Sequence, residues 1–309
     1  MIAALFPGQN SQVVGMAKEF YDVSPAAKAV LDRAEAALPG LLDIMWEGPE
    51  EVLKLTANQQ PALVAAGAAA FAAYLEAGGE KPKYAAGHSL GEFSAHVAAG
   101  SLGLEDAVRL VRKRGQYMQD AVPEGKGAMA AVIKVDAAQV KEVCEEVAQS
   151  SGGVVEVANY NSPEQTVISG ESSAVQRASE QLKERRARVV PLNVSAPFHC
   201  RLMKPAANKL ALILKEVDFA SPSFEVRSNV TADVVTDVSH VPHLLEEQVT
   251  HAVRWVELVQ RLQGLGVTTF LEFGSSKVLS GLVKRIDKTA DASAIYNPET
   301  LAGLQEVSK

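Results

Sequence analysis

The segment Gly87-His88-Ser89-Leu90-Gly91 places a serine between two glycines, which is the Gly-x-Ser-x-Gly spacing of a nucleophile elbow. A short apolar run precedes the segment and a helical pattern follows it, as a strand–turn–helix unit requires. The glycines allow the tight turn, and the turn lifts the serine hydroxyl out of the sheet. The backbone N–H of Leu90 would then lie at a helix N-terminus, where it can donate to an oxyanion. The spacing predicts that Ser89 is a nucleophile.

A serine nucleophile needs a base, and His199 is the best placed of the six histidines. It ends the rigid turn Ala196-Pro197-Phe198-His199 and opens a predicted helix, and the order serine then histidine matches other α/β hydrolytic enzymes. A packing or capping role for His199 is the alternative. The other histidines are too close to Ser89 in the turn, or lie farther along predicted helices: His88, His96, His240, His243 and His251.

The predicted helix over residues 104–121 carries a positive charge on its apolar face. Arg114 lies four residues after Leu110, three after Val111 and four before Met118, which places it among inward-facing side chains. An inward guanidinium is costly unless an anion meets it. Two interpretations follow: a buried ion pair with a protein carboxylate, or a bidentate clamp for a substrate that carries a carboxylate.

The loop Phe6-Pro7-Gly8-Gln9-Asn10-Ser11-Gln12 leaves the first predicted strand and enters a helix. Loops at the C-terminal ends of parallel strands are where open α/β sheets bind ligands. The backbone N–H of Gln9 could therefore supply a second oxyanion donor. A plain turn explains the Pro-Gly pair equally well.

The elements that would position these residues alternate between short apolar runs and amphipathic stretches, which predicts an α/β fold with a mainly parallel sheet. The pattern changes at the turn-rich segment 123–127, and the order βαββαβ that follows is typical of a ferredoxin-like unit. The interpretation is a large domain of residues 1–125 and 195–309, interrupted by a small domain of residues 126–194. A helical region is expected over 242–263, and the last ~20 residues are expected to form a loose tail.

Composition and charge exclude several classes of protein. Hydrophobic residues make up 47% of the 309 residues, which is enough for a sizeable core. Lys and Arg number 30 against 37 Asp and Glu, and this net charge of −7 argues against general nucleic-acid binding. Two cysteines, Cys144 and Cys200, exclude a disulfide scaffold and a Cys-rich zinc site, and His240 and His243 have no partner at metal-binding spacing. No metal site is predicted.

Neither a signal peptide nor a membrane span is expected. The first residues carry no basic segment, and the longest uncharged apolar run, Ala62 to Leu75, has 14 residues, below the ~18 needed to span a bilayer. We therefore expect a soluble cytoplasmic protein without a membrane partner.

Five separated motifs along the chain resemble, in type and order, those of the malonyl-CoA:acyl-carrier-protein transacylases, a family of acyltransferases that supply fatty-acid synthesis with malonyl units. The resemblance covers nearly the whole chain, to about Ile286, and implies a hydrolase-like core with the inserted ferredoxin-like subdomain. Its motifs are Phe6-Pro7-Gly8-Gln9 with Ser11-Gln12, Gly87 to Glu92, Asn159-x-Asn161-Ser162-Pro163, Pro197-Phe198-His199 and Ser228-Asn229-Val230-Thr231-Ala232.

The resemblance implies roles for individual residues. It makes Ser89 the nucleophile, His199 the base and Arg114 the clamp for the malonyl carboxylate, with oxyanion donors from the amides of Leu90 and Gln9. A backbone carbonyl near Gln248, rather than an acidic residue, would orient the histidine. Three residues would shape the acyl pocket, and the ring of the last would leave little room for a branched acyl group: Met118, Asn161 and Phe198.

The sequence departs from the family pattern at three places. Asn10 stands where glycine is usual, the loop Gly274-Ser275-Ser276-Lys277 replaces Gly-Pro-Gly-Lys, and His251-Ala252 stands where Ser-Pro is common. The first predicts a small backbone strain if φ is positive. The other two concern the shape of a loop and the carbonyl near Gln248.

The partners implied are malonyl-CoA and an acyl carrier protein, with no cofactor and no nucleic acid. Because carrier proteins are acidic and this chain is acidic too, docking would need a local basic patch. Two groups are candidates: Lys183, Arg185, Arg186 and Arg188, and Lys284, Arg285 and Lys288. The alternative functions are a serine thioesterase or hydrolase acting on acyl thioesters, a relative that only binds acyl-CoA or a carrier protein, and a transacylase for another acyl group.

Overall fold

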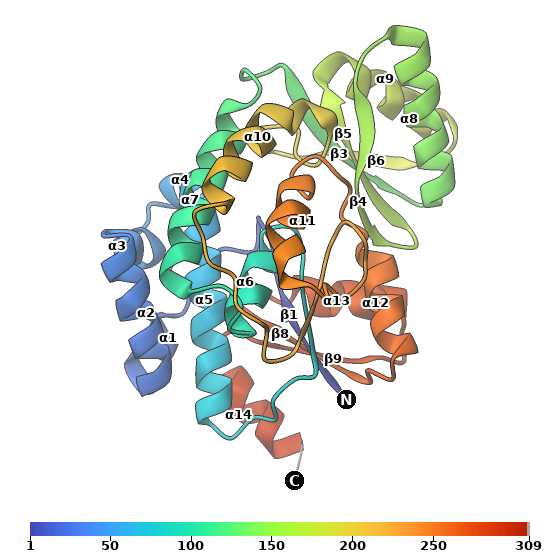
Figure 1. Ribbon diagram of the computed structural model, residues 1–309. Coiled ribbons are helices and arrows are strands. Elements are labelled where there is room, and N and C mark those ends of the chain that lie inside the picture. Colours follow the sequence, from blue (N-terminus) through green and yellow to red (C-terminus); the bar gives the residue numbers. More distant parts are fainter. Residues whose placement is uncertain (308–309) are drawn as a thin grey trace.

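The computed structural model describes residues 1–307, and its centre is a parallel sheet of five strands in the order β7-β2-β1-β8-β9 (Figure 1). Each neighbouring pair of strands in this sheet is parallel. The central strands read as short continuous apolar runs because both faces are covered. The strands are β1 (Ile2–Phe6), β2 (Tyr84–Gly87), β7 (Glu225–Arg227), β8 (Thr269–Phe273) and β9 (Asp291–Ile295).

Helices cover both faces of this sheet, so that the large part of the molecule has three layers. Side chains alternate along β1: Ala4 and Phe6 enter one core, and Ala3 and Leu5 enter the other. On the first face, α5 (Thr56–Glu76) and α6 (Gly91–Ala98) contact the strands, and three more helices pack on these helices or on one another: α2 (Pro25–Ala37), α7 (Leu104–Asp120) and α10 (Lys204–Leu214). The second is covered by α12 (Trp255–Gly264) and α13 (Val278–Ile286).

The remaining helices of the large part are shorter or peripheral. They are α1 (Lys18–Val23), α3 (Leu41–Trp46), α4 (Glu50–Leu53), α11 (Val241–Glu247), α14 (Pro298–Val307) and two 3₁₀ turns, Arg201–Met203 and Val238–His240. The helix expected directly after the loop of Phe6 to Gln12 begins only at Lys18 in the structure, and the short helices α3 and α4 were not predicted from the sequence.

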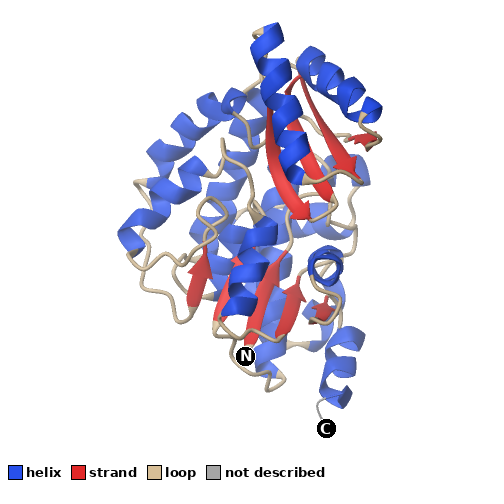
Figure 2. Cartoon of the chain, turned by 90° about the vertical axis from the view of Figure 1, so that its right-hand side faces the viewer, coloured by secondary structure: helices blue, strands red, loops and turns tan. Residues whose placement is uncertain are grey.

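A second sheet, antiparallel and of four strands, lies apart from the first (Figure 2). Its order, β4-β5-β3-β6, with two helices packed on one face, is that of a ferredoxin-like βαββαβ unit and confirms the predicted fold class. The division of the chain into domains stays a prediction. The elements are β3 (Gly127–Ile133), α8 (Ala137–Ser151), β4 (Val155–Ser162), β5 (Gln165–Glu171), α9 (Ser172–Glu184) and β6 (Arg188–Pro191).

Helix α8 forms as its sequence predicts. The side chain of Asp136 caps it by accepting a hydrogen bond from the N–H of Gln139 at 2.9 Å, and Gly152 ends it in the left-handed conformation. The apolar side of α8, which includes Cys144, is buried in the core of this unit.

The structure differs from the sequence-based expectation in two C-terminal segments. Residues 248–254 do not continue a helix, because the backbone of Val253 pairs with β4 instead: its N–H donates to Ala158, and its carbonyl accepts from Tyr160, both at 2.9 Å. The expected loose tail is wrong up to residue 307, since β9 pairs with β8 and α14 packs on the core; residues 308–309 of that tail lie outside the described residues. Within residues 1–307, no helix combines the length and the apolar character needed to cross a membrane.

Candidate active site

Ser89 occupies the sharp turn between β2 and α6, with a positive φ of 54°. The glycines on either side are required by close backbone contacts. A Cβ at position 87 would lie 1.8 Å from the carbonyl carbon of Gly91, and one at position 91 would lie 1.9 Å from the carbonyl oxygen of Phe6. A left-handed serine held by such packing is the strained geometry expected of an elbow.

Asn229 holds this turn from the loop that follows β7. Its Oδ1 accepts the N–H of Ser89, and its Nδ2 donates to the carbonyl of Gly87, both at 2.6 Å. In the sequence, Asn229 belongs to the motif Ser228 to Ala232 but has no predicted role. The sequence shows only that Asn229 lies in a polar segment after a buried strand. The fold shows that its side chain reaches the elbow.

His199 lies against the serine, with its Nε2 2.7 Å from Ser89 Oγ. Its Nδ1 is 2.8 Å from the carbonyl oxygen of Gln248 and 3.2 Å from that of His251. Since carbonyl oxygens only accept, Nδ1 must carry the proton, and Nε2 is left as an acceptor for the serine hydroxyl. The carbonyl near Gln248 therefore lies where it can orient the ring, and no described carboxylate takes that place.

Burial, and next to it the positive charge of Arg114, lower the pKa of His199 from its ordinary value to about 3. Ser89 and His199 are 8% and 4% exposed, so water does little to screen this effect. The imidazole is neutral at neutral pH, which is the state that can accept a proton from Ser89.

Arg114 extends from α7 to the same point and is fully buried. Its Nη2 lies 3.3 Å from Ser89 Oγ and donates to Gln248 Oε1 at 2.9 Å, while Nη1 donates to Gln60 Oε1 at 2.9 Å. Within residues 1–307 these partners are all neutral, and no carboxylate pairs with the guanidinium directly. The predicted alternative of a buried ion pair is therefore absent from the described part of the chain.

The guanidinium keeps donors free for a ligand. Of its five N–H groups, the Nε–H and one on Nη1 have no partner among the described residues. Burial lowers the pKa of Arg114 to about 10, opposed by the charge of Glu92, so the group stays protonated at neutral pH. A buried, charged fork beside a serine hydroxyl is a site for a carboxylate.

The two predicted oxyanion donors lie on adjoining loops. The loop of Gln9 packs on the elbow, since a Cβ at Gly8 would lie 2.5 Å from the carbonyl oxygen of His88, and the N–H of His88 donates to Phe6 at 3.0 Å. No acceptor within residues 1–307 takes the backbone N–H of Gln9 or of Leu90. Both amides are available to a bound carbonyl oxygen.

The three predicted acyl-pocket residues are buried around this point. Met118 contacts Gln60, whose Nε2 lies 3.8 Å from its sulfur, and so adjoins the Arg114 partner. Asn161 Oδ1 lies 2.8 Å from His88 Nε2, next to Ser89 in the chain. Phe198 precedes His199 and is buried.

The departures from the family pattern are accommodated locally. Asn10 adopts a positive φ of 68°, which asparagine tolerates better than most residues. In the loop after β8, Ser275 Oγ donates to the carbonyl of Ser11 at 2.8 Å, and Ser276 Oγ donates to Glu272 at 3.2 Å. The serines thereby tie this loop to the loop of Gln9 and to β8.

The two candidate docking groups differ in how free their charges are. Arg185 is paired with Glu142 at 2.6 Å and Glu146 at 3.1 Å, so its charge is largely balanced. Arg285 donates to Gln165 at 2.9 Å. The other members are exposed on the surface: Lys183, Arg186, Arg188, Lys284 and Lys288.

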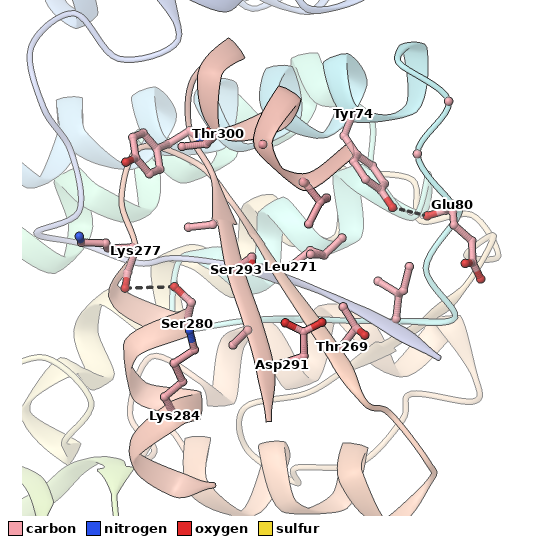
Figure 3. A pocket seen from close by; sticks show the side chains of 18 residues that line it. Tyr74, Glu80, Thr269, Leu271, Lys277, Ser280, Lys284, Asp291, Ser293 and Thr300 are labelled. Carbon is pink, nitrogen blue, oxygen red and sulfur yellow. Dashed lines mark hydrogen bonds between the residues drawn. The ribbon is translucent and has the colours of Figure 1, made fainter. Parts of the chain in front are cut away.

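A separate cavity of about 970 Å³ opens around the edge strand β9 (Figure 3), and of the predicted site and docking residues only Lys284, a docking candidate, lines it. Its walls are tied by hydrogen bonds from Tyr74 to the carbonyl of Glu80 and from Ser280 to that of Lys277. Among residues 1–307, no group of three or more His, Cys, Asp or Glu side chains could hold a metal ion.

Two further buried polar residues had no predicted role: Gln60, described above, and Glu92, the last residue of the motif Gly87 to Glu92. Glu92 Oε2 accepts hydrogen bonds from the Nε2 of Gln248 at 2.6 Å and from the N–H of Asn229 at 3.0 Å. The signal for Glu92 was of the same kind as that for Arg114, because it is the one Asp, Glu, Lys or Arg between Lys83 and Glu105.

The chain is similar to known proteins along nearly its whole length. The acyl transferase domain family matches residues 4–305. The malonyl CoA-acyl carrier protein transacylase of Bacillus subtilis (strain 168) is 48% identical over 302 residues, covering 97% of this chain and 95% of the relative. The protein of the same name from Escherichia coli (strain K12) is 44% identical over 307 residues, covering 99% of each chain.

Solved structures are similar over the same length. An acyl-carrier-protein S-malonyltransferase from Burkholderia pseudomallei 1710b superposes with a TM-score of 0.95 at 43% identity, covering 99% of each chain. A malonyl-transacylase solved in complex with a holo type II PKS acyl-carrier protein gives a TM-score of 0.95 at 42% identity, also covering 99% of each. Matched along nearly its whole length in sequence and in structure, this chain belongs to the acyl transferase family, among the malonyl CoA-acyl carrier protein transacylases.

Proposed function

We propose that the protein transfers a malonyl group from CoA to the phosphopantetheine thiol of an acyl carrier protein, and thereby supplies fatty-acid synthesis. The observation that carries the proposal is Arg114: a fully buried cation, without a direct carboxylate partner in the described chain, 3.3 Å from Ser89 Oγ. The same serine and histidine would serve a hydrolase, but an uncharged acyl group would leave this guanidinium without a ligand.

The first half of the reaction forms a malonyl-serine ester. His199 Nε2 takes the proton of Ser89 as Oγ attacks the thioester carbonyl, and the amides of Leu90 and Gln9 hold the oxyanion. The C–S bond then breaks, and CoA leaves as a thiol with the proton returned by His199. Arg114 meanwhile holds the malonyl carboxylate with its free donors.

The second half reverses these steps with another thiol. The phosphopantetheine thiol of the carrier gives its proton to His199 and attacks the malonyl-Ser89 ester. The ester C–O bond breaks, and His199 returns the proton to Ser89 Oγ. The chemistry proposed uses no metal and no redox cofactor, and we place the reaction in the cytoplasm.

Product partition tests this function against the hydrolase alternative. The protein is incubated with malonyl-CoA and holo carrier protein, and malonyl-carrier and free malonate are measured over the same time. A transacylase is expected to produce malonyl-carrier far faster than malonate. Malonate released at a rate independent of the carrier would instead identify a hydrolase.

The low pKa of His199 predicts an unusual pH profile. The base must be neutral, and its neutral form persists as pH falls to well below 6.5, because the pKa is about 3 in the folded protein. An imidazole of ordinary pKa would retain about one tenth of its neutral form at pH 5.5, whereas this enzyme is expected to keep most of its kcat/KM there. The measurement is the rate of CoA release between pH 5 and 8 at constant ionic strength. An acid limb centred near pH 6.5 would contradict the assignment.

A second prediction concerns docking of the carrier. Arg186 is exposed, and Arg186→Glu is expected to slow transfer to the carrier several-fold at low salt, because rim charges mainly set the encounter rate. Formation of malonyl-Ser89 from malonyl-CoA should not change. Lys284→Glu makes the same test of the other candidate group. If neither variant changes the rate of transfer to the carrier, both groups are excluded as docking surfaces.

A further inference from the structure

Glu92 is a buried carboxylate, 1% exposed, that lies three residues after Ser89 in the chain, in the first turn of α6. The proposed reaction assigns it no chemical step. Its Oε2 accepts from Gln248 Nε2 and from the N–H of Asn229, as described above. A buried carboxylate is costly to keep, so its hydrogen bonds point to what it does.

The side chain of Gln248 connects Glu92 to Arg114. Its Nε2 donates to Glu92 at 2.6 Å and to the carbonyl of Ser89 at 2.9 Å, and its Oε1 accepts from Arg114 Nη2 at 2.9 Å. An amide has distinct donor and acceptor ends. If the amide turned over, its NH₂ group would face the guanidinium, donor against donor, and its oxygen would face a carboxylate, acceptor against acceptor.

The orientation of this amide therefore depends on Glu92. Both acceptors that hold Nε2 are needed, because an NH₂ group has two hydrogens and each is used. The carbonyl of Ser89 is fixed by the elbow, so Glu92 is the acceptor that a side-chain substitution can remove. Burial raises the pKa of Glu92 to about 7, yet a protonated carboxyl keeps one oxygen that can accept.

We propose that Glu92 is a positioning residue, whose carboxyl fixes the Gln248 amide so that the amide oxygen holds Arg114 in the orientation that receives the acyl carboxylate beside Ser89. Glu92 itself does not touch the substrate. The inference rests on the proposed function, since it concerns selection of an acyl group that carries a negative charge.

This role predicts a loss of selectivity rather than a uniform loss of rate. In Glu92→Leu the amide is free to turn, and the hydrogen bond that steadies Arg114 is lost. The carboxylate of malonyl-CoA needs that orientation, and acetyl-CoA has no carboxylate to place. We expect the ratio of kcat/KM for malonyl-CoA to that for acetyl-CoA, measured as acylation of Ser89, to fall about tenfold.

Three further variants separate this role from simple support of the fold. Glu92→Gln retains an oxygen that can accept from Gln248 Nε2, and should restore the ratio to near that of the native protein. Gln248→Met removes the amide but keeps the backbone carbonyl that faces His199, and should lower the ratio as Glu92→Leu does. If Glu92 acts through Gln248, the double variant should lose no more than either single one.

A matched control is Glu272, a second buried glutamate, held by Ser276 and Ser280 after β8. Glu272→Leu should lower the thermal midpoint of unfolding without changing the malonyl-to-acetyl ratio. A reduced ratio in this control would show that replacing any buried acid disturbs selectivity, and would overturn the inference.

The remaining outcomes also decide the question. If Glu92→Leu lowers kcat/KM equally for malonyl-CoA and acetyl-CoA, the residue is structural. If the two substitutions lower the malonyl-to-acetyl ratio independently, so that their effects multiply in the double variant, Glu92 does not act through Gln248. Should Glu92→Leu fail to fold, an unchanged ratio in Gln248→Met alone would overturn the proposal. A native protein that forms no malonyl-Ser89, or prefers acetyl-CoA, would instead refute the proposed function itself.

Discussion

Replacing Ser89 with alanine is expected to abolish the covalent acyl-enzyme. The native protein incubated with malonyl-CoA should gain the mass of one malonyl group on the peptide that contains Ser89, and Ser89→Ala should gain none. Transfer to the carrier should fall by at least about 10³-fold, because every step of the proposed mechanism passes through this oxygen. The 2.7 Å contact with His199 Nε2 is the geometric basis for this expectation.

The matched control is Ser94, a serine on α6, the helix that follows the turn of Ser89, and it is more deeply buried than Ser89. Ser94→Ala should form the acyl-enzyme normally, and both variants should unfold cooperatively, which separates loss of the nucleophile from loss of the fold. A malonyl adduct that persists on Ser89→Ala, detected by intact mass spectrometry, would refute the assignment of the nucleophile.

Replacing Arg114 with alanine is expected to remove the preference for malonyl-CoA. Breaking a buried charge pair costs roughly 3–5 kcal/mol, so kcat/KM for malonyl-CoA should fall between about 10²-fold and about 4 × 10³-fold. Acylation by acetyl-CoA should fall far less, or rise, because the variant no longer places an unpaired cation beside an uncharged acyl group. The measurement is the initial rate of acylation of Ser89 with each substrate at equal concentration.

Two other variants on α7 make this result specific. Lys113 is exposed, and Lys113→Ala removes a positive charge from the same helix without reaching the site; its selectivity should be that of the native protein. Arg114→Lys keeps a charge but not the planar fork, and should recover part of the preference. If Arg114→Ala lowered the rate of acylation equally with both substrates, the residue would be structural and the preference for malonyl-CoA would need another explanation.

The pattern of residues predicted several features because their physical basis is local. The short apolar run before Ser89 predicts a strand, and the glycines on either side of Ser89 predict a tight turn into a helix. The structure contains this strand, turn and helix. The apolar periodicity of α7 placed Arg114 inward without any knowledge of its neighbours. The order of elements over 127–191 likewise fixed the ferredoxin-like arrangement, since βαββαβ with short connections leaves few ways to pair.

Other features depend on partners that are distant in the chain. Asn229 reaches the elbow across 140 residues, and Gln248 reaches Arg114 across 134, so no local pattern could assign either contact. The same holds for the C-terminal segment: β9 exists because β8 offers a free parallel edge, which a weakly patterned sequence does not reveal.

The sequence by itself determined the nucleophile's turn, the inward cation and the two kinds of sheet, because each is encoded in the types and spacing of neighbouring residues. Tertiary structure alone decided that residues 248–254 leave the helical path. The backbone of Val253 exchanges two hydrogen bonds with β4 there instead of continuing a helix, and the carbonyl oxygen of Gln248 lies 2.8 Å from Nδ1 of His199. The acceptor that fixes the base is thus a consequence of packing between distant segments.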